Sequence, residues 1–183
     1  MNNIEEFQIK PISYKDLNTI LKWRNSKNIK STMYTEHQIT WEEHTKWYQK
    51  ITSDPKEMVF VFYHKDRPLG VVNFSDINKL HSRCYWGFYI GEESAPQGSG
   101  TIMGVLALNK IFKEIGLHKV CAEVIASNNR SYRYHQKLGF EPEGRLVDHV
   151  CKNDQYEEVI PMGLFSNRWE IKKHEILKQL KGG

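Results

Sequence analysis

The segment Gln97-Gly98-Ser99-Gly100-Thr101-Ile102 combines two closely spaced glycines with the start of a helix-forming run. Glycine lets a ligand approach the backbone closely because it has no side chain in the way. The first turn of a helix presents unpaired N–H groups and a partial positive charge, and phosphate groups bind there. A strand-like run, residues 85–90, comes before the segment. We therefore interpret residues 97–102 as a cradle for a pyrophosphate.

The elements that would position this cradle can be predicted from the periodicity of apolar residues. Alternating or continuous apolar runs predict strands at residues 7–12, 58–63, 68–74, 83–90, 120–125, 144–152 and 155–164. Apolar residues at helical spacing predict helices at residues 17–23, 41–51, 103–113, 129–138 and 169–180. Strands that alternate with helices in this order indicate a mixed α/β sheet with helices on its faces.

The composition narrows the class of protein. A net charge of +4 without a basic run gives no footprint for nucleic acid, although it suits an anionic small molecule. The cysteines are widely spaced and the histidines are scattered, so we expect no metal site. No apolar run is long enough to span a membrane, and the polar start of the chain does not resemble a secretion signal. We therefore expect a cytoplasmic protein.

A second motif, residues 128–140, follows the cradle and reads NNRSYRYHQKLGF. It resembles the Asn-x-x-Ala/Ser, helix and Gly-Phe signature of the GCN5-related N-acetyltransferase (GNAT) superfamily. The cradle resembles the Gln/Arg-x-x-Gly-x-Gly/Ala loop with which that superfamily holds the pyrophosphate of acetyl-CoA. The resemblance implies a mixed, mostly antiparallel twisted sheet of about seven strands, flanked by helices, with a V-shaped splay between its two central strands. It implies one domain over residues 1–181, with a tail at residues 182–183.

The N-terminal half is similar to a smaller group within this superfamily, in residues 21–25, 33–34, 44–47, 73–77 and 86–90. That group transfers acetyl from acetyl-CoA to the 4-amino group of a UDP-linked 4-amino-4,6-dideoxy-N-acetyl-L-altrosamine, a step in pseudaminic acid synthesis. The resemblance implies direct attack of the amine within a ternary complex. It also implies a nucleotide sugar as the partner molecule, no nucleic acid or membrane partner, and a monomer or homodimer.

Two other functions remain open. The Trp-Arg-Asn run at residues 23–25 also occurs in acetyltransferases that act on protein N-termini, including those of ribosomal proteins, and on aminoglycosides. The chain also departs from the superfamily pattern at two positions. Ile102 stands where the cradle usually has Gly or Ala, and His135 stands where many relatives have the tyrosine that protonates the departing thiolate. These departures keep open an inactive acyl-CoA-binding or interaction module on the same fold.

The resemblance assigns the donor site to the strand before the cradle, the cradle itself and the helix after residue 128. Free backbone groups of the strand would pair with pantetheine and polarise the thioester carbonyl. Asn128 would bond the pantetheine arm, and Arg130, Arg133 or Lys137 would be available to the 3′-phosphate. The implied cofactor-binding residues are Phe88, Tyr89, Ile90, Gln97, Gly98, Ser99, Gly100, Thr101, Ile102, Asn128, Ser131, Tyr134 and Lys137.

The candidate catalytic residues are His135, Tyr134, Ser75 and Asp76. His135 and Tyr134 are alternatives for the acid that protonates the CoA thiolate, because neighbours on a helix are separated by about 100° and only one can point into a cleft. A histidine with a near-neutral pKa can donate such a proton. Ser75 and Asp76 end a predicted strand, where a water relay for deprotonating the amine could start.

The implied acceptor-binding residues are Arg24, Asn25, Met33, Tyr34, His44, Trp47, Ser75 and Tyr89. Arg24 would reach phosphates or sugar, and Asn25 would reach hydroxyls. His44 and Trp47 are three residues apart and share a helix face. Residues in such a pattern on an amphipathic helix can also belong to the core.

Overall fold

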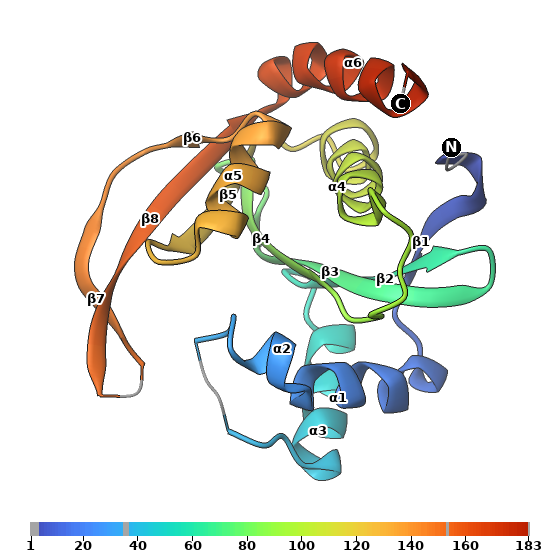
Figure 1. Cartoon of the computed structure of the whole chain (residues 1–183), viewed down its shortest axis with the longest axis vertical. Coiled ribbons are helices and arrows are strands. Elements are labelled where there is room, and N and C mark those ends of the chain that lie inside the picture. Colours follow the sequence, from blue (N-terminus) through green and yellow to red (C-terminus); the bar gives the residue numbers. More distant parts are fainter. Residues whose placement is uncertain (1–3, 35–36, 153, 183) are drawn as a thin grey trace.

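The computed structural model describes residues 4–34, 37–152 and 154–182, which fold around one sheet of eight strands (Figure 1). The strands are β1 (Phe7–Pro11), β2 (Met58–His64), β3 (Arg67–Asn78), β4 (Arg83–Ile90), β5 (Lys119–Ile125), β6 (Glu141–Pro142), β7 (Leu146–Lys152) and β8 (Gln155–Phe165). Their order is β1-β2-β3-β4-β5-β8-β6, and β7 also pairs with β8. Only β4 and β5 run parallel, so the predicted mixed, mostly antiparallel sheet is confirmed. The strand without a prediction is β6, which has two residues.

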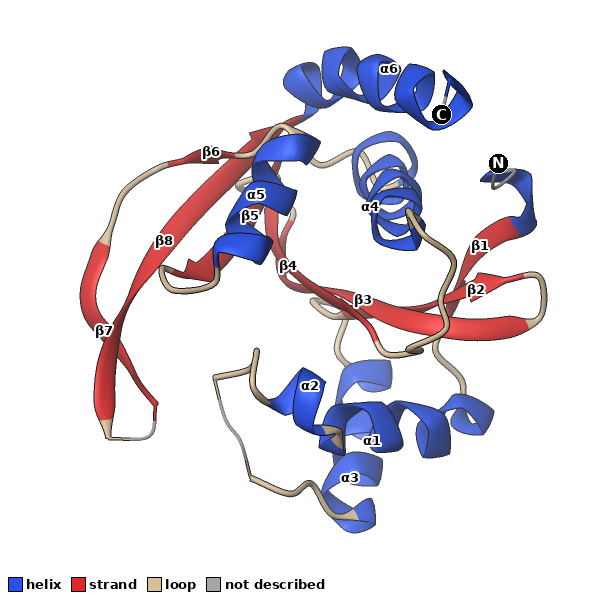
Figure 2. Ribbon diagram, in the orientation of Figure 1, coloured by secondary structure: helices blue, strands red, loops and turns tan. Residues whose placement is uncertain are grey.

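Helices cover both faces of the sheet (Figure 2). The described residues form α1 (Leu17–Asn25), α2 (Lys27–Lys30), α3 (Trp41–Ser53), α4 (Ser99–Asn109), α5 (Asn129–Leu138) and α6 (Ser166–Gly182). Helices α1 to α3 lie on one face, and α4 to α6 lie on the other. The four-residue α2 was not predicted because it is too short to show a helical period. The predicted tail residue Gly182 ends α6, and Gly183 lies outside the described residues.

The core consists of two apolar clusters, one on each face of the sheet. Side chains alternate along a strand, so neighbouring residues of β2 enter different clusters. Phe62 belongs to the larger cluster beneath α4 to α6, and Val61 belongs to the smaller cluster against α1 and α3. Trp169 of α6 is fully buried in the larger cluster, and its indole N–H donates to Asn109 Oδ1 at 3.1 Å. The alternation therefore gives the sheet two independent apolar faces.

The predicted splay lies between β4 and β5. These strands pair only where residues 83–85 meet residues 119–121, and beyond that point they separate. Ser82 accepts from Lys119 N–H on the β5 side, and Leu69 accepts from Gly91 N–H on the β3 side. Hydrogen-bonding direction alternates along a strand, so the backbone groups of Phe88 and Ile90 face the splay. The splay therefore exposes a row of main-chain donors and acceptors.

Helices α4 and α5 meet beside the splay at Gly104. A Cβ at this position would lie 2.6 Å from Tyr134 Oη and 2.9 Å from Leu138 Cδ1, closer than atoms pack. Leu138 is fully buried, and the rigid ring of Tyr134 ends in a hydroxyl that donates to Gly100 O at 2.6 Å. The absence of a side chain at Gly104 therefore sets the close approach of the two helices.

We expect Gly104→Ala to lower the free energy of unfolding, measured by urea denaturation. Overpacking of a core costs about 1–3 kcal/mol, which exceeds the gain of about 1 kcal/mol in helix propensity from glycine to alanine. Gly100→Ala is the matched control in the same helix, because its Cβ would meet nothing closer than 3.8 Å. A Gly104→Ala protein as stable as Gly100→Ala would contradict this account of the packing.

Candidate active site

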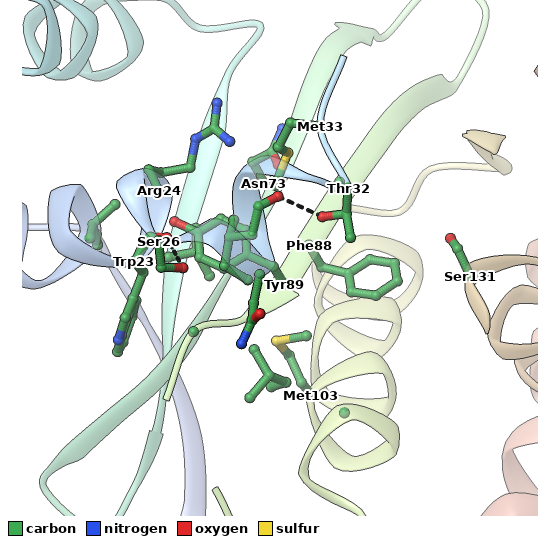
Figure 3. Close-up of a pocket in the computed structure, with 18 of the residues that line it drawn as sticks. Trp23, Arg24, Ser26, Thr32, Met33, Asn73, Phe88, Tyr89, Met103 and Ser131 are labelled. Atoms are coloured by element: carbon green, nitrogen blue, oxygen red, sulfur yellow. Dashed lines mark hydrogen bonds between the residues drawn. The ribbon is translucent and has the colours of Figure 1, made fainter. Parts of the chain in front are cut away.

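A cleft of about 1730 Å³ opens at the splay and runs between the two helical layers. Figure 3 shows side chains from α1, the loop after α2, β3 and β4 meeting there, with Ser131 of α5 on the far side. Most of the predicted site residues line it, namely Arg24, Met33, Tyr34, His44, Trp47, Ser75, Phe88, Tyr89, Ile90, Gln97, Gly98, Ser99, Gly100, Asn128, Ser131, Tyr134 and His135. Five predicted residues do not, namely Asn25, Asp76, Thr101, Ile102 and Lys137.

The cradle forms the first turn of α4. Gly98 caps the helix at φ +87°, a left-handed conformation that favours glycine. Ile102 N–H donates to Gly98 O at 3.1 Å, and the side chain of Ile102 is buried. Neither the N–H group nor the side chain of Ile102 is therefore available to a ligand in the cleft. Gly100 and Thr101, by contrast, have no carbonyl partner within the helix for their N–H groups. Isoleucine at position 102 therefore does not impede the approach of a ligand, because it faces the core.

Two further groups support an anion at this helix start. Ser99 Oγ is buried and has no hydrogen-bond partner among the described residues. Lys137 reaches from α5 and donates from Nζ to Thr101 Oγ1 at 3.1 Å. Lys137 does not line the cleft itself, but it places a positive charge beside the first turn of α4. A helix N-terminus with an added cation suits phosphate.

The main chain and the side chain of Tyr89, on β4, contact different parts of the protein. Tyr89 pairs with Val71, so its backbone groups face β3 rather than the splay. Its side chain packs with the smaller apolar cluster, and its hydroxyl is buried without a partner among the described residues. Burial raises the pKa of this phenol. The backbone groups that face the splay therefore come from Phe88 and Ile90, and Tyr89 contributes its side chain to the opposite face.

His135 is held inside the protein by both ring nitrogens. The indole N–H of Trp86 donates to Nε2 at 3.2 Å, and Nδ1 lies 2.8 Å from Ser131 O. An indole can only donate, so Nε2 must accept and the proton resides on Nδ1, which donates to Ser131 O. Burial lowers the pKa of His135 to about 4. In this arrangement His135 is neutral near pH 7 and directs no proton into the cleft.

Tyr134, the neighbouring candidate, lines the cleft beside the cradle. Its hydroxyl donates to Gly100 O at 2.6 Å, and its ring contacts Phe88 with centroids 4.7 Å apart. Burial raises the pKa of Tyr134, so the phenol keeps its proton over the neutral range. Tyr134 therefore has a proton and a position next to the donor-site backbone.

Asn128 begins α5 as its N-cap. Its side-chain oxygen accepts from Ser131 N–H at 3.0 Å, which satisfies one of the unpaired donors of the first turn. The side chain also lines the cleft. Its amide oxygen is therefore committed to the helix, while the residue still borders the donor site.

One wall of the cleft is formed by α1, α3 and the segment that joins them. Arg24 lines the cleft with its Nη1 buried and without a partner among the described residues. His44 is 3% exposed; it bonds from Nε2 to Leu17 O at 3.1 Å and stacks on Trp47. Burial lowers the pKa of His44, with the positive charge of Arg24 as a smaller contribution. His44 therefore ties α3 to α1 and supports the pocket wall.

Asn25 has a structural contact in place of the predicted contact with acceptor hydroxyls. Its side-chain amide donates to Ile39 O at 2.8 Å and accepts from Ile39 N–H at 2.9 Å. These two hydrogen bonds between the side chain of Asn25 and the backbone of Ile39 anchor the segment that carries Met33 and Tyr34. The sequence could not reveal it, because the two residues are 14 positions apart in the chain.

Glu123 is a cleft residue that the sequence analysis missed. Val120, Ala122 and Val124 of β5 enter the larger apolar cluster, so Glu123 points to the acceptor face. Its Oε2 accepts from Tyr34 O–H at 3.1 Å, and burial together with Glu123 raises the pKa of that phenol. Strand alternation could have identified this residue. Glu123 places a carboxylate beside the splay.

The side chains of Ser75 and Asp76, which were predicted to act together, lie in different places. Ser75 lines the cleft, whereas Asp76 is exposed and forms a 3.8 Å ion pair with Arg83. Asp76 has φ +48°, within an irregularity of β3 that separates the directions of the two side chains. Of these two residues, Ser75 alone lines the cleft.

Among the described residues, no group of three or more His, Cys, Asp or Glu is arranged to hold a metal ion. No helix in the described part of the chain is long and apolar enough to cross a membrane.

Comparison with known proteins adds a family and several relatives. A family model described as an acetyltransferase (GNAT) domain matches residues 7–141. Spermidine N(1)-acetyltransferase of Escherichia coli (strain K12) is 25% identical over 169 residues, which cover 92% of this chain and 91% of that protein. An acetyltransferase named PseH from Campylobacter jejuni is 24% identical over 156 residues, covering 82% of this chain and 94% of that protein. The [ribosomal protein uS5]-alanine N-acetyltransferase of Escherichia coli is 30% identical, over 55% of this chain and 53% of that protein.

A solved structure supports the fold. Spermidine N-acetyltransferase from Vibrio cholerae, crystallised in complex with CoA and spermine, matches with a TM-score of 0.85 at 24% identity. The match covers 91% of this chain and 99% of that chain. The predicted fold is therefore confirmed over nearly the whole chain.

The buried, neutral state of His135 predicts a specific loss of stability in acid. Its pKa is lowered in the folded protein, so between about pH 6.5 and pH 4 the unfolded chain binds a proton that the folded chain does not. The free energy of unfolding is therefore complete above that range and falls as the pH decreases through it. One pKa unit corresponds to about 1.4 kcal/mol, so His135 contributes a loss of about 3 kcal/mol.

Urea denaturation of wild type and His135→Asn at several pH values tests this prediction. Asparagine does not titrate, so the variant should lose less stability than wild type between pH 7 and pH 4. Equal losses in the two proteins would show that His135 titrates normally in the fold.

Proposed function

Because the chain belongs to the GNAT acetyltransferase family and is an acetyl-CoA-dependent N-acetyltransferase, we propose that its acceptor is the primary amine of a nucleotide-linked amino sugar. The acceptor that we favour is the 4-amino group of UDP-linked 4-amino-4,6-dideoxy-N-acetyl-L-altrosamine. The observation that carries the proposal is the pair Arg24 and Tyr89, whose Nη1 and Oη atoms are buried without a partner among the described residues. A guanidinium in that state is complementary to a phosphate or diphosphate.

A polyamine is the second candidate acceptor. Two of the relatives are spermidine N-acetyltransferases, and the carboxylates of Glu43, Glu57 and Glu123 line the cleft. A polyamine carries only positive charges, however, and would leave the guanidinium of Arg24 both unpaired and repelled. A nucleotide sugar brings negative charge to Arg24 and still presents an amine to the carboxylate of Glu123, so we favour it.

The donor site fits acetyl-CoA, which supplies the acetyl group as a thioester. Gly98, with its left-handed backbone, and the buried, unpartnered Ser99 hydroxyl form the cradle for the pyrophosphate. Lys137 adds positive charge at the same place. The main-chain groups of Phe88 and Ile90 would hold the pantetheine arm in the splay. A main-chain N–H from this row would also stabilise the oxyanion that forms on attack.

Glu123 is the residue that we propose to accept the proton of the acceptor amine. It stands on the acceptor face of β5 beside the splay, and Tyr34 holds its carboxylate with a 3.1 Å hydrogen bond. A positioned carboxylate can remove a proton directly or through one water. An uncharged amine is required, because an ammonium has no lone pair for attack.

For protonation of the departing thiolate, we propose Tyr134. Its phenol retains a proton near pH 7 and lies against Phe88, whereas both nitrogens of His135 are bonded within the protein. The hydroxyl would move from Gly100 O to the thiolate. His135 instead holds α5 against Trp86, which orients Tyr134.

Arg24→Met should separate the two candidate acceptors. With the UDP-amino-sugar we expect wild type to release CoA thiol, and the variant to show at least a tenfold higher KM for the sugar with an unchanged KM for acetyl-CoA, because a charge-assisted contact is lost. Lys22→Met, an exposed cation of the same helix that also lines the cleft, is the control and should change the sugar KM little. Turnover of spermidine without turnover of the sugar in wild type would reverse the proposal.

Tyr134→Phe should lower kcat by at least about tenfold, since general acid catalysis contributes about 10²–10⁴-fold. The KM for acetyl-CoA should change little, because the ring and its contact with Phe88 remain. His135→Asn is the comparison and should retain more of kcat than Tyr134→Phe does. The opposite order of the two variants would assign the proton donor to His135.

A further inference from the structure

The strand register places a row of polar side chains on the acceptor face of the sheet. Val59 of β2 is paired with Asn73 of β3, and Asn73 is paired with Gly87 of β4. Side chains two residues apart on a strand share a face, so Ser75 lies on the face of Asn73, and Glu57 directly precedes β2. All three polar residues, Glu57, Asn73 and Ser75, line the cleft. They form the floor of the cleft at the end where β4 and β5 are still paired.

Gly87 leaves space on this floor for Asn73. A Cβ at Gly87 would lie 2.8 Å from Asn73 Oδ1, so a side chain there would collide with the amide. The amide of Asn73 therefore extends over β4, toward the splay. Figure 3 shows Asn73 beside Met33, on the side of the pocket where Arg24 and Tyr89 also lie.

The three side chains have capacity for hydrogen bonds that the described part of the protein does not use. No hydrogen bond joins the carboxylate of Glu57, the amide of Asn73 or the hydroxyl of Ser75 to another described group. Glu57 is half-buried, and burial together with the charges of Asp54 and Asp76 raises its pKa. A desolvated carboxylate without a partner is costly, so a ligand that donates hydrogen bonds to it would be favoured.

We propose that Glu57, Asn73 and Ser75 form a subsite that binds the hydroxyl or amide groups of the acceptor sugar, away from its reacting amine. This subsite rests on the proposed function, and it specifies the part of the acceptor that these residues bind. Neighbouring strands are about 4.8 Å apart, so β3 and β2 place these groups about 5 and 10 Å from β4, within the span of a sugar residue.

The chemistry of the row favours a neutral polar group over an ammonium. A distal ammonium of a polyamine only donates hydrogen bonds, so it would pair with Glu57 but could not accept from Asn73 or Ser75. Hydroxyl and amide groups both donate and accept. They can therefore satisfy all three side chains.

Steady-state kinetics of Glu57→Gln with the UDP-amino-sugar tests this subsite. We expect at least a tenfold increase in the KM for the sugar, with the KM for acetyl-CoA unchanged and kcat within about twofold. Glu93→Gln is the matched control, an exposed carboxylate at the cleft with a 3.5 Å contact to Asn28, and it should leave both KM values unchanged.

Deoxy and desacetyl analogues of the sugar distinguish a direct contact from a structural effect. In wild type, one analogue should lose affinity, and in Glu57→Gln the same analogue should lose much less, because the contact has already been removed. Equal losses in the two proteins, or an unchanged sugar KM in Glu57→Gln, would overturn the subsite while leaving the proposed function intact. Failure of wild type to acetylate the sugar at all would overturn both.

Discussion

The divergence of β4 and β5 is the constraint on which the rest of the site depends. Parallel pairing ends after Tyr85 and Cys121, and the main-chain groups of Phe88 and Ile90 are left facing a gap instead of a neighbouring strand. Unpaired backbone groups are costly when they are buried, so the gap must contain a ligand or solvent. Acetyl-CoA is the co-substrate of this family, and its pantetheine arm has the amides that can take the place of the missing strand.

The gap persists because α5 is packed against it rigidly. Trp86 stacks on Phe140 and donates to His135, and His135 in turn donates to Ser131 O, so one buried network joins β4 to both ends of α5. Gly104 lets α4 approach the same helix. A histidine can serve in this network only while it is neutral. His135 thus contributes to the packing of α5 against β4.

Local signals in the sequence were sufficient to predict the sheet, the main helices and the start of a helix at residues 98–99. The glycines of the cradle favour a conformation that few other residues adopt, and they correctly predicted the start of a helix. The motif from Asn128 to Phe140 correctly predicted a helix that begins at a capping residue and ends at a glycine. Features set by distant contacts could not be predicted in this way. The clamp between Asn25 and Ile39, the tautomer of His135 and the direction of Asp76 all depend on partners far along the chain or on a strand irregularity. The burial of Ile102 also follows from tertiary packing, so the loop pattern alone could not show that this side chain faces the core.

In the proposed function, one face of the sheet binds the acetyl donor and the other face binds the acceptor. Helices α4 and α5, with the larger apolar cluster, form the donor side, and α1 to α3, with the smaller cluster, form the acceptor side. The two sides meet at the splay, beside Gly87 of β4 and Glu123 of β5. Substitutions on α1 or in the loop after α2 can therefore change the acceptor without disturbing the cradle. This separation explains how relatives of similar fold bear the names of different acceptors, and why the identity of the acceptor must be sought in the charges of Arg24, Glu57 and Glu123 rather than in the fold.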